Sequence, residues 1–479
     1  AVNRLNLSVF EGEIFGFIGP NGAGKTTTLR MMSGILAPTE GSVTIDGIGL
    51  AGEPEKAKQR IGYIPDRPFL YEKLTGMEFL RFTADLFGVE DGLFRGQSES
   101  LLNKFSLYDW RNELIESYSH RMKQRLIISA TLLHDPKVLV IDEPMVGLDP
   151  AGIRMIKNLF RDLAKKWKNA LFHTALSWSG ALTLIFVSTW ISGAIYFKGL
   201  SKSQTSAGKL FSFTGWRRFG YDSLLKRLSR PARAFIEKEI KTFFRDQTQW
   251  SQIFLVMGLI VIYLYNFSVL PLERSAIKLE YLQNLLSFLN MGLAAFVLSA
   301  ISARFVFPAV SLEGEAFWIV RASPLSIRTF LWIKFFVYFI PLLLLSELLV
   351  VLTNILLDVT PFMIVLSVLT VFLIVPGIVA MGIGLGAIYP DFKSESPTQS
   401  VTSLGGLIYM TLCMGFIAAV IIIEAGPVYS IFMTGIRRDG LTYFQWAWIV
   451  CSFAIVLGLC VAAVLIPMRR GEKKILQTE

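Results

Sequence analysis

Two short stretches of this 479-residue sequence combine residue types and spacings that could do chemistry. The first is GPNGAGKT, in which Gly19 to Thr26 fit the pattern G-x-x-x-x-G-K-[ST]. Glycines let backbone N–H groups wrap around phosphate oxygens at the positive end of a helix. In such a loop Lys25 reaches the terminal phosphates and the Thr26 hydroxyl ligates Mg²⁺. The spacing therefore predicts a phosphate-binding loop.

The second stretch is KVLVIDEP, residues 137–144, in which two carboxylates follow a short apolar run. The run 138–141 is typical of a buried strand. Such a strand delivers Asp142 and Glu143 to its C-terminal end, where open α/β sheets bind ligands. There Asp142 can hold Mg²⁺ through water, and Glu143 can orient or deprotonate an attacking water molecule. We expect Glu143 to be the catalytic residue.

These side chains need particular elements to position them. The sequence predicts a strand before Gly19, a helix that starts near Lys25, and the buried strand before Asp142. This order indicates an α/β P-loop NTPase over residues 1–166. The nucleotide-binding residues that it predicts are Gly19, Pro20, Asn21, Gly22, Ala23, Gly24, Lys25, Thr26 and Thr27.

The stretches GPNGAGKTT, VLVIDEP and GLDP resemble the ATP-binding domain of ABC transporters. Residues 118–125, YSHRMKQR, look like the signature segment of that family, and residues 61–80 look like the segment around its Q-loop. The resemblance implies a domain that binds ATP and Mg²⁺ and closes on a second ATP-binding domain. It also assigns Asp149 to the D-loop.

The sequence departs from the family pattern at three sites. In the signature, Ser119, His120, Arg121 and Met122, the side chains of His120 and Arg121 replace glycines, which disfavours a positive φ. Asp66 replaces the Q-loop glutamine, where it can still contact Mg²⁺. His173 is a weak candidate for the switch histidine, because an uncharged run follows it. These departures predict little or no ATP hydrolysis by this chain alone, although an altered signature that needs a normal partner remains an alternative.

The rest of the chain is apolar. The sequence is 53% hydrophobic and its mean hydropathy is +0.51, above the range of soluble proteins. Several runs of about 20 residues are long enough to cross a bilayer. Much of the net charge of +10 flanks these runs, as positive-inside topology requires, which argues against nucleic-acid binding. The three cysteines form no metal or disulfide pattern.

We therefore expect an all-α polytopic membrane domain after the ATP-binding domain. One transmembrane helix is expected within 167–197, followed by a basic cytosolic linker with an interfacial helix at 198–250. Six further spans are expected within 251–468, and a cytosolic tail at 469–479. The seven expected spans are 171–197, 251–272, 282–303, 335–357, 362–389, 403–423 and 444–468.

The join near Trp167 raises a difficulty of topology. Seven spans with a cytosolic C-terminus would place the ATP-binding domain outside the cell. We interpret the chain as the front of an ATP-binding subunit, clipped at both ends, joined to the rear of a permease. A deletion, a shifted or misassembled reading frame, or an artificial fusion would each produce this. Alternatively, 171–197 is re-entrant or lies in the membrane interface.

Segments of the membrane half resemble ABC-2-like exporter permeases, namely 245–252, 311–335 and 384–399. The charged loop 304–334 is either a coupling helix that docks on the ATP-binding domain or a solvated connector. Residues 230–246 form an amphipathic pattern that is typical of an interfacial helix. Glu347 lies in the middle of a span, where it is either functional or bonded to a neighbouring helix.

The sequence thus predicts an ATP-hydrolysing exporter of the ABC type in the cell membrane, with its ATP-binding domain in the cytoplasm. Its expected partners are a second ATP-binding domain, further permease helices, membrane lipid and an unidentified transported substrate, and no nucleic acid. The alternative is a catalytically weak fusion or remnant, or an ATP-dependent regulatory membrane protein that transports nothing.

Overall fold

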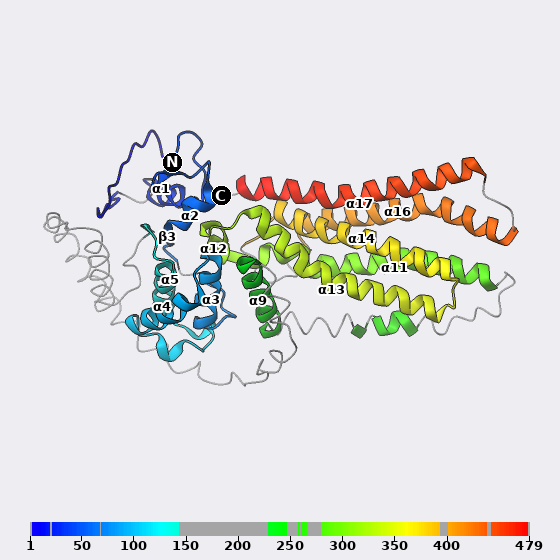
Figure 1. Cartoon of the computed structure of the whole chain (residues 1–479), viewed down its shortest axis with the longest axis horizontal. Helices are drawn as coiled ribbons and strands as arrows, with labels where there is room; N and C mark the ends of the chain where they lie inside the picture. The colour runs from blue at the N-terminus through cyan, green and yellow to red at the C-terminus, as the bar shows by residue number, and fades with distance from the viewer. Residues whose placement is uncertain are drawn as a thin grey trace. The chain divides into compact units, whose positions relative to one another are not determined.

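The computed structural model describes residues 2–19, 22–67, 69–142, 229–246, 257–258, 260–265, 279–392, 401–437 and 442–477 (Figure 1). The chain forms two compact units. The first combines Ala1–Arg30 with Ile141–Ser229, and the second combines Met31–Val140 with Arg230–Glu479.

In the first unit, the phosphate loop leads directly into helix α1 (Lys25–Met32). Gly22 and Gly24 have φ of 84° and 83°, a conformation that side chains with a Cβ rarely adopt. The strand expected before the loop does not form among the described residues. A strand needs a hydrogen-bonded neighbour, and residues 13–19 have none there, while Ile14 and Ile18 are exposed.

The second strand forms as expected. β4 (Val138–Ile141) pairs with β3 (Ile61–Ile64), whose four residues are all buried. A separate hairpin joins β1 (Thr44–Ile45) to β2 (Ile48–Gly49). Its turn, Asp46-Gly47, has positive φ at both positions, as a tight two-residue hairpin loop requires.

Helices and 3₁₀ turns accompany these strands in the second unit, with α2 and α5 packed against β3. They are α2 (Pro54–Gln59), α3 (Gly76–Phe87), α4 (Asp91–Lys104) and α5 (His120–Leu132), with 3₁₀ turns η1 (Tyr108–Trp110) and η2 (Ile115–Ser117). A capping box starts α3: Thr75 accepts from the Glu78 N–H, and Glu78 accepts from the Thr75 N–H. Gly88 ends α3 in the left-handed conformation. Helix α3 packs against α5 and against α9 (Arg230–Arg245).

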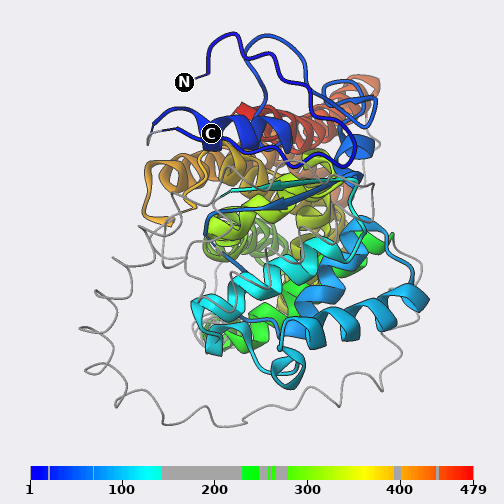
Figure 2. The same ribbon diagram turned by 90° about the vertical axis from the view of Figure 1, so that its left-hand side faces the viewer.

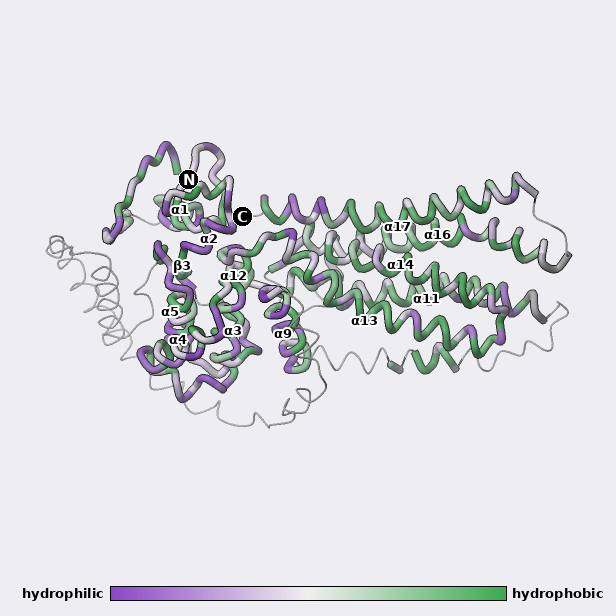
Figure 3. The backbone as a smooth tube through the Cα atoms, in the orientation of Figure 1, coloured by the Kyte–Doolittle hydropathy of each residue, from purple (hydrophilic) through white to green (hydrophobic). Residues whose placement is uncertain are grey.

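Five long apolar helices follow: α11 (Leu279–Phe305), α13 (Ile327–Leu356), α14 (Pro361–Ile388), α16 (Leu404–Arg437) and α17 (Tyr443–Gln477). They run side by side, as Figures 1 and 2 show, and are hydrophobic along most of their length (Figure 3). Each contributes to one of the five segments among the described residues that are long and apolar enough to cross a membrane. They correspond to five of the seven expected spans. The span 171–197, and most of 251–272, lie outside the described residues.

Two of these helices extend beyond the expected spans. The sequence ended a span at 423, whereas α16 continues to Arg437; Pro427 lies inside it without ending it. Similarly, α17 continues past 468 into the basic tail. Hydropathy marks where a helix is apolar, but backbone hydrogen bonds can continue through polar residues.

Glycines let α14 and α17 approach closely. A Cβ on Gly384 would lie 2.5 Å from the Pro467 carbonyl carbon, and one on Gly471 would lie 2.7 Å from the Gly384 oxygen. Contacts this short are prohibitive, so only glycine fits at these positions. Close packing of α14 and α17 at this point therefore depends on the two glycines.

Short elements connect α11 to α13. These are η5 (Phe307–Ala309), η6 (Ser311–Ala316) and α12 (Phe317–Ala322). Gly314 interrupts η6 with φ 57°, so the backbone turns sharply there. Phe307, Val310 and Val320 are buried, which anchors the connection to the protein and leaves little of it in solvent.

Candidate nucleotide-binding site and its link to the membrane helices

The phosphate loop has the backbone expected of an anion cradle. Lys25 begins α1, and its Nζ donates to the Gly19 oxygen at 2.7 Å, so the ammonium lies over the loop. Inside the helix, the Thr28 hydroxyl donates to the Gly24 oxygen at 2.9 Å. The glycine conformations and the helix start therefore direct N–H groups and positive charge to the place where phosphates would bind.

The two expected Mg²⁺ residues of the first unit meet. The Thr26 Oγ1 donates to the Asp142 Oδ1 at 3.3 Å, across 116 residues of sequence. Asp142 is only 3% exposed. Neighbouring oxygens around Mg²⁺ lie about 3 Å apart, since each is about 2.0–2.1 Å from the ion. The spacing therefore fits a Mg²⁺ ion in either of two arrangements. In one, the Thr26 hydroxyl and the Asp142 carboxylate both ligate the ion directly. In the other, Asp142 holds the ion through a water molecule.

Several predicted site residues lie outside the described residues: Pro20, Asn21, Glu143, Asp149 and His173. Their roles stay predictions. Asp66 follows β3 and is half-buried, but it belongs to the second unit, while the phosphate loop belongs to the first. Its contact with Mg²⁺ also stays a prediction.

The signature segment takes an ordinary helical form. Ser119 caps α5, accepting from the Met122 N–H at 3.3 Å, and His120 and Arg121 form the first turn. Neither His120 nor Arg121 has a positive φ, as expected from the side chains that replace glycines there. All three of Ser119, His120 and Arg121 are exposed. The segment is therefore compatible with a contact to phosphate or to a partner domain.

The charged loop 304–334, which follows α11, docks on residues 58–71; we call this part of the chain the ATP-binding side. The sequence left open whether the loop docks as a coupling helix or is a solvated connector, and these contacts decide in favour of docking. The Trp318 Nε1 donates to the Phe69 oxygen at 2.9 Å, and its ring lies edge-on to Tyr63. Lys58 donates to the Arg321 oxygen at 2.6 Å. Burial and the Arg321 charge lower the pKa of Lys58 to about 8. Helix α12 thus sits against β3 and the segment that follows it.

Helix α9 forms where the amphipathic pattern predicts a helix, and it packs against protein; its expected place in the membrane interface stays a prediction. Phe235 is fully buried between Phe82 of α3 and Phe330 of α13. Glu78 of α3 forms a two-pronged ion pair with Arg245, at 2.6 and 3.1 Å. Burial alone would raise the pKa of Glu78, but Arg245 and Lys241 lower it to about 2.

A buried cluster of four charges lies where α9, η6 and α13 meet; we call it the charge cluster. It contains Lys238, Glu239, Glu313 and Lys334, with side-chain exposures of 4, 15, 0 and 2%. Lys238 donates to Glu313 at 2.7 and 2.8 Å and to Glu239 at 2.8 Å. Lys334 donates to Glu239 at 2.7 Å and also pairs with Glu313.

The charge cluster is electrically balanced, with two cations and two anions. Burial would raise the pKa of Glu239, but the charges of Lys238 and Lys334 lower it to about 2. Sequence reasoning missed this cluster. The available signal was the acidic and basic residues in otherwise apolar positions of 311–335, but sequence distance did not show which of them meet.

Glu347 of α13 and Glu424 of α16 lie away from the ends of their apolar helices. Glu424 of α16 accepts from the Thr370 hydroxyl of α14, at 3.1 and 3.0 Å, and is 1% exposed. The sequence missed it because the expected span ended at 423. Both carboxyl oxygens of Glu347 are buried without a hydrogen-bond partner among the described residues. The alternative of a bond to a neighbouring helix is therefore not supported there.

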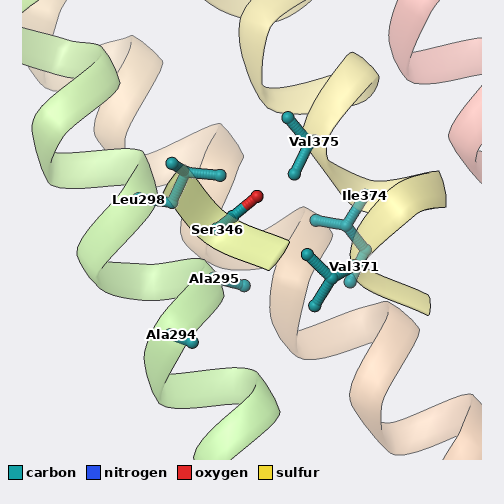
Figure 4. A pocket seen from close by; sticks show the side chains of 7 residues that line it. All are labelled: Ala294, Ala295, Leu298, Ser346, Val371, Ile374 and Val375. Carbon is teal, nitrogen blue, oxygen red and sulfur yellow. The ribbon is translucent and has the colours of Figure 1, made fainter. Parts of the chain in front are cut away.

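A small gap between α11, α13 and α14 is almost wholly apolar (Figure 4). Ser346 supplies the one oxygen drawn there, and its hydroxyl already donates to the Leu343 oxygen at 2.9 Å. The residues that line the gap are Ala294, Ala295, Leu298, Ser346, Val371, Ile374 and Val375. The gap offers no free polar group to a substrate.

Family comparisons agree with this architecture. A family described as a putative ATP-binding cassette matches residues 154–479, more than half of the chain, and the chain belongs to this family. A second family, described as ABC transporter, matches residues 2–146. Members of the ABC ATP-binding family are ATPases coupled to transport. The ABC transporter match ends at residue 146 and the other match begins at residue 154, so the boundary between them lies before Trp167.

Three relatives come from Bacillus subtilis. The uncharacterized ABC transporter ATP-binding protein YhcH is 41% identical over 165 residues, covering 34% of this chain and 53% of that protein. NatA, an ABC transporter ATP-binding protein, is 31% identical over 204 residues, covering 42% and 83%. The linearmycin resistance ATP-binding protein LnrL is 40% identical over 162 residues, covering 34% and 52%. The chain spans about half the length of most of these relatives.

Proposed function

We propose that this chain binds Mg-ATP at its phosphate loop and works as part of an ATP-driven exporter in the cell membrane. The observation that carries the proposal is the Thr26–Asp142 contact beside the glycine loop. It brings a hydroxyl and a buried carboxylate together where the loop would hold the phosphates. Bound Mg²⁺ would offset phosphate charge there, with Thr26 and Asp142 as its protein contacts. Glu143 would then orient or deprotonate the attacking water.

Transport outward is supported by two relatives. One is named for linearmycin resistance, and the other, from Bacillus licheniformis, is named for bacitracin transport. We propose export for this chain as well, with a substrate whose identity the apolar helix faces do not indicate. ABC ATPases work as dimers with permease components. We therefore propose a second ATP-binding domain, further permease helices and membrane lipid as partners.

The docking of α12 on the ATP-binding side supports transport over the alternative. A regulator or remnant without a transport role would not need these contacts between residues 58–71 and helix α12. The altered signature and the change of family between 146 and 154 favour a catalytically weak fusion. The catalytically weak fusion is our second candidate function. The join near Trp167 and the transmembrane helix within 167–197 are proposals.

A nucleotide titration tests the binding site. Lys25→Ala removes the ammonium over the loop and should weaken Mg-ATP binding, whereas wild type and Lys56→Ala should bind alike. Lys56 is a matched control because its side chain is 71% exposed and pairs with nearby Glu53. Equal affinity in wild type and Lys25→Ala would contradict the assignment.

Steady-state ATPase rates separate the two candidates. Losing a general base or its support costs about 10²–10⁴-fold in rate. We expect the purified chain alone to hydrolyse ATP little or not at all. A rate of about 1–10³ s⁻¹, typical of enzymes, that Glu143→Gln abolishes would establish a competent ATPase and remove the second candidate.

A further inference from the structure

Tyr71 connects the ATP-binding side of the second unit to the charge cluster. Its hydroxyl donates to the Glu313 Oε2 at 2.6 Å, and its ring lies 4.2 Å from the Lys238 Nζ. The side chain is 8% exposed. Burial and the charge of Glu313 hold the pKa of Tyr71 well above its usual value, so the hydroxyl stays a donor. One side chain thus touches both an anion and a cation of the cluster.

Tyr71 lies close enough to β3 in the sequence that a movement of this strand would displace it. It follows β3 by seven residues, and β3 pairs with β4, whose last residue precedes Asp142. The residues between β3 and Tyr71 also carry the Phe69 oxygen that binds Trp318. A shift of this segment therefore acts on η6 and α12 at two points.

The charge cluster joins Tyr71 to three elements at once. Glu313 comes from η6, Lys238 and Glu239 from α9, and Lys334 from α13. Lys238, Glu313 and Lys334 are buried and Glu239 is half-buried, and each is bonded to at least one opposite charge. Separating one from the rest would leave an uncompensated buried charge, so the members are expected to move together.

We propose that Tyr71 is a positioning residue that transmits the nucleotide state to the first turns of α13 through the charge cluster. This inference rests on the proposed ATP binding. The hydroxyl-to-carboxylate bond is the directional part of the link. The Lys238–ring contact alone is weaker and less directional. Removing the hydroxyl should therefore uncouple α13 while the nucleotide site stays intact.

Hydrogen–deuterium exchange of the full chain in lipid nanodiscs, with and without Mg-ATP, tests this. In wild type, ATP should change the exchange of peptides within 327–340. Tyr71→Phe, which keeps the ring over Lys238, should bind ATP with wild-type affinity but lose that change. Lys238→Met interrupts the cluster from α9 and should cause the same loss. Unfolding temperatures show whether each variant is folded.

Thr83→Val is the matched control. It also removes a buried hydroxyl, but one that donates to the Phe79 oxygen of its own helix α3. It should keep the ATP-dependent change. A full change in folded Tyr71→Phe would overturn the inference. So would ATP binding by wild type with no change in 327–340, a result that leaves the proposed ATP binding standing. If wild type binds no ATP, both proposals are wrong.

Discussion

At the scale of single residues, Asp142 shows how a buried carboxylate can serve an ion. It lies 3.3 Å from the Thr26 hydroxyl and is 3% exposed. Asp142→Asn keeps the shape but removes the charge. Losing a residue that supports a metal through water typically costs about 10–100-fold in metal affinity. ATP affinity should therefore fall by about that factor with Mg²⁺ and change little in EDTA. An equal loss in EDTA would contradict a role in holding Mg²⁺.

His134 makes a second prediction at this scale, one that concerns pH. Its ring stacks on Phe87 at 3.9 Å, and its Nε2 bonds to the Ile61 oxygen at 3.1 Å. Burial lowers the pKa of His134 to about 4, although the bond to Ile61 opposes this. The unfolded chain, with a pKa near the usual 6.5, then binds a proton that the folded chain does not. The contribution of this pKa difference to stability is therefore fully present above about pH 6.5 and is lost as the pH falls towards 4.

When the pH is lowered from 7 to 5, protonation of His134 in the unfolded chain should lower the free energy of unfolding by about 2 kcal/mol. The measurement is the unfolding temperature of the full chain in detergent at the two pH values. His134→Phe keeps an aromatic ring beside Phe87 and should reduce the pH dependence, even though it loses the bond to Ile61. A pH dependence as steep as that of wild type would show that other groups cause it.

At the scale of elements, α9 holds α3 to the apolar helices. Arg245→Met leaves Glu78 half-buried with Lys241, 3.2 Å away, as its remaining cation. Hydrogen bonds between charged groups contribute about 1.5–3 kcal/mol, so amide exchange in α9 should become faster by a corresponding amount. Arg233→Met is the control on the same helix, because Arg233 pairs at 3.5 Å with Glu237 one turn away. Equal exchange in the two variants would exclude a special role for Arg245.

At the scale of the whole molecule, the apolar helices predict a membrane topology. If α17 crosses the bilayer, its two ends lie on opposite sides, and the basic tail favours a cytosolic C-terminus. In a chain whose three native cysteines are replaced, Thr442→Cys, directly before α17, should react with an impermeant thiol reagent in intact cells. Glu472→Cys should react only after permeabilisation. Labelling of both sites from one side would contradict the topology proposed for α17.

The sequence by itself determined those features that depend on local pattern. The glycine spacing of 19–26 dictates the loop, because positive φ at Gly22 and Gly24 depends on those residues alone. The apolar run 138–141 indicates β4, and unbroken hydropathy indicates the five long helices. The replacement of glycines at 120 and 121 likewise argues against positive φ there, and neither residue has one.

Only the tertiary structure decided which distant side chains meet. Lys238, Glu313 and Lys334 lie on three elements, and each charge by itself favours a solvated position. Burial becomes tolerable only when opposite charges arrive together, a condition that no local pattern contains. The same holds for Tyr71, whose 2.6 Å bond to Glu313 spans 242 residues. The sequence therefore determined the nucleotide loop and the membrane helices, and folding decided the contacts that link residues 58–71 to those helices.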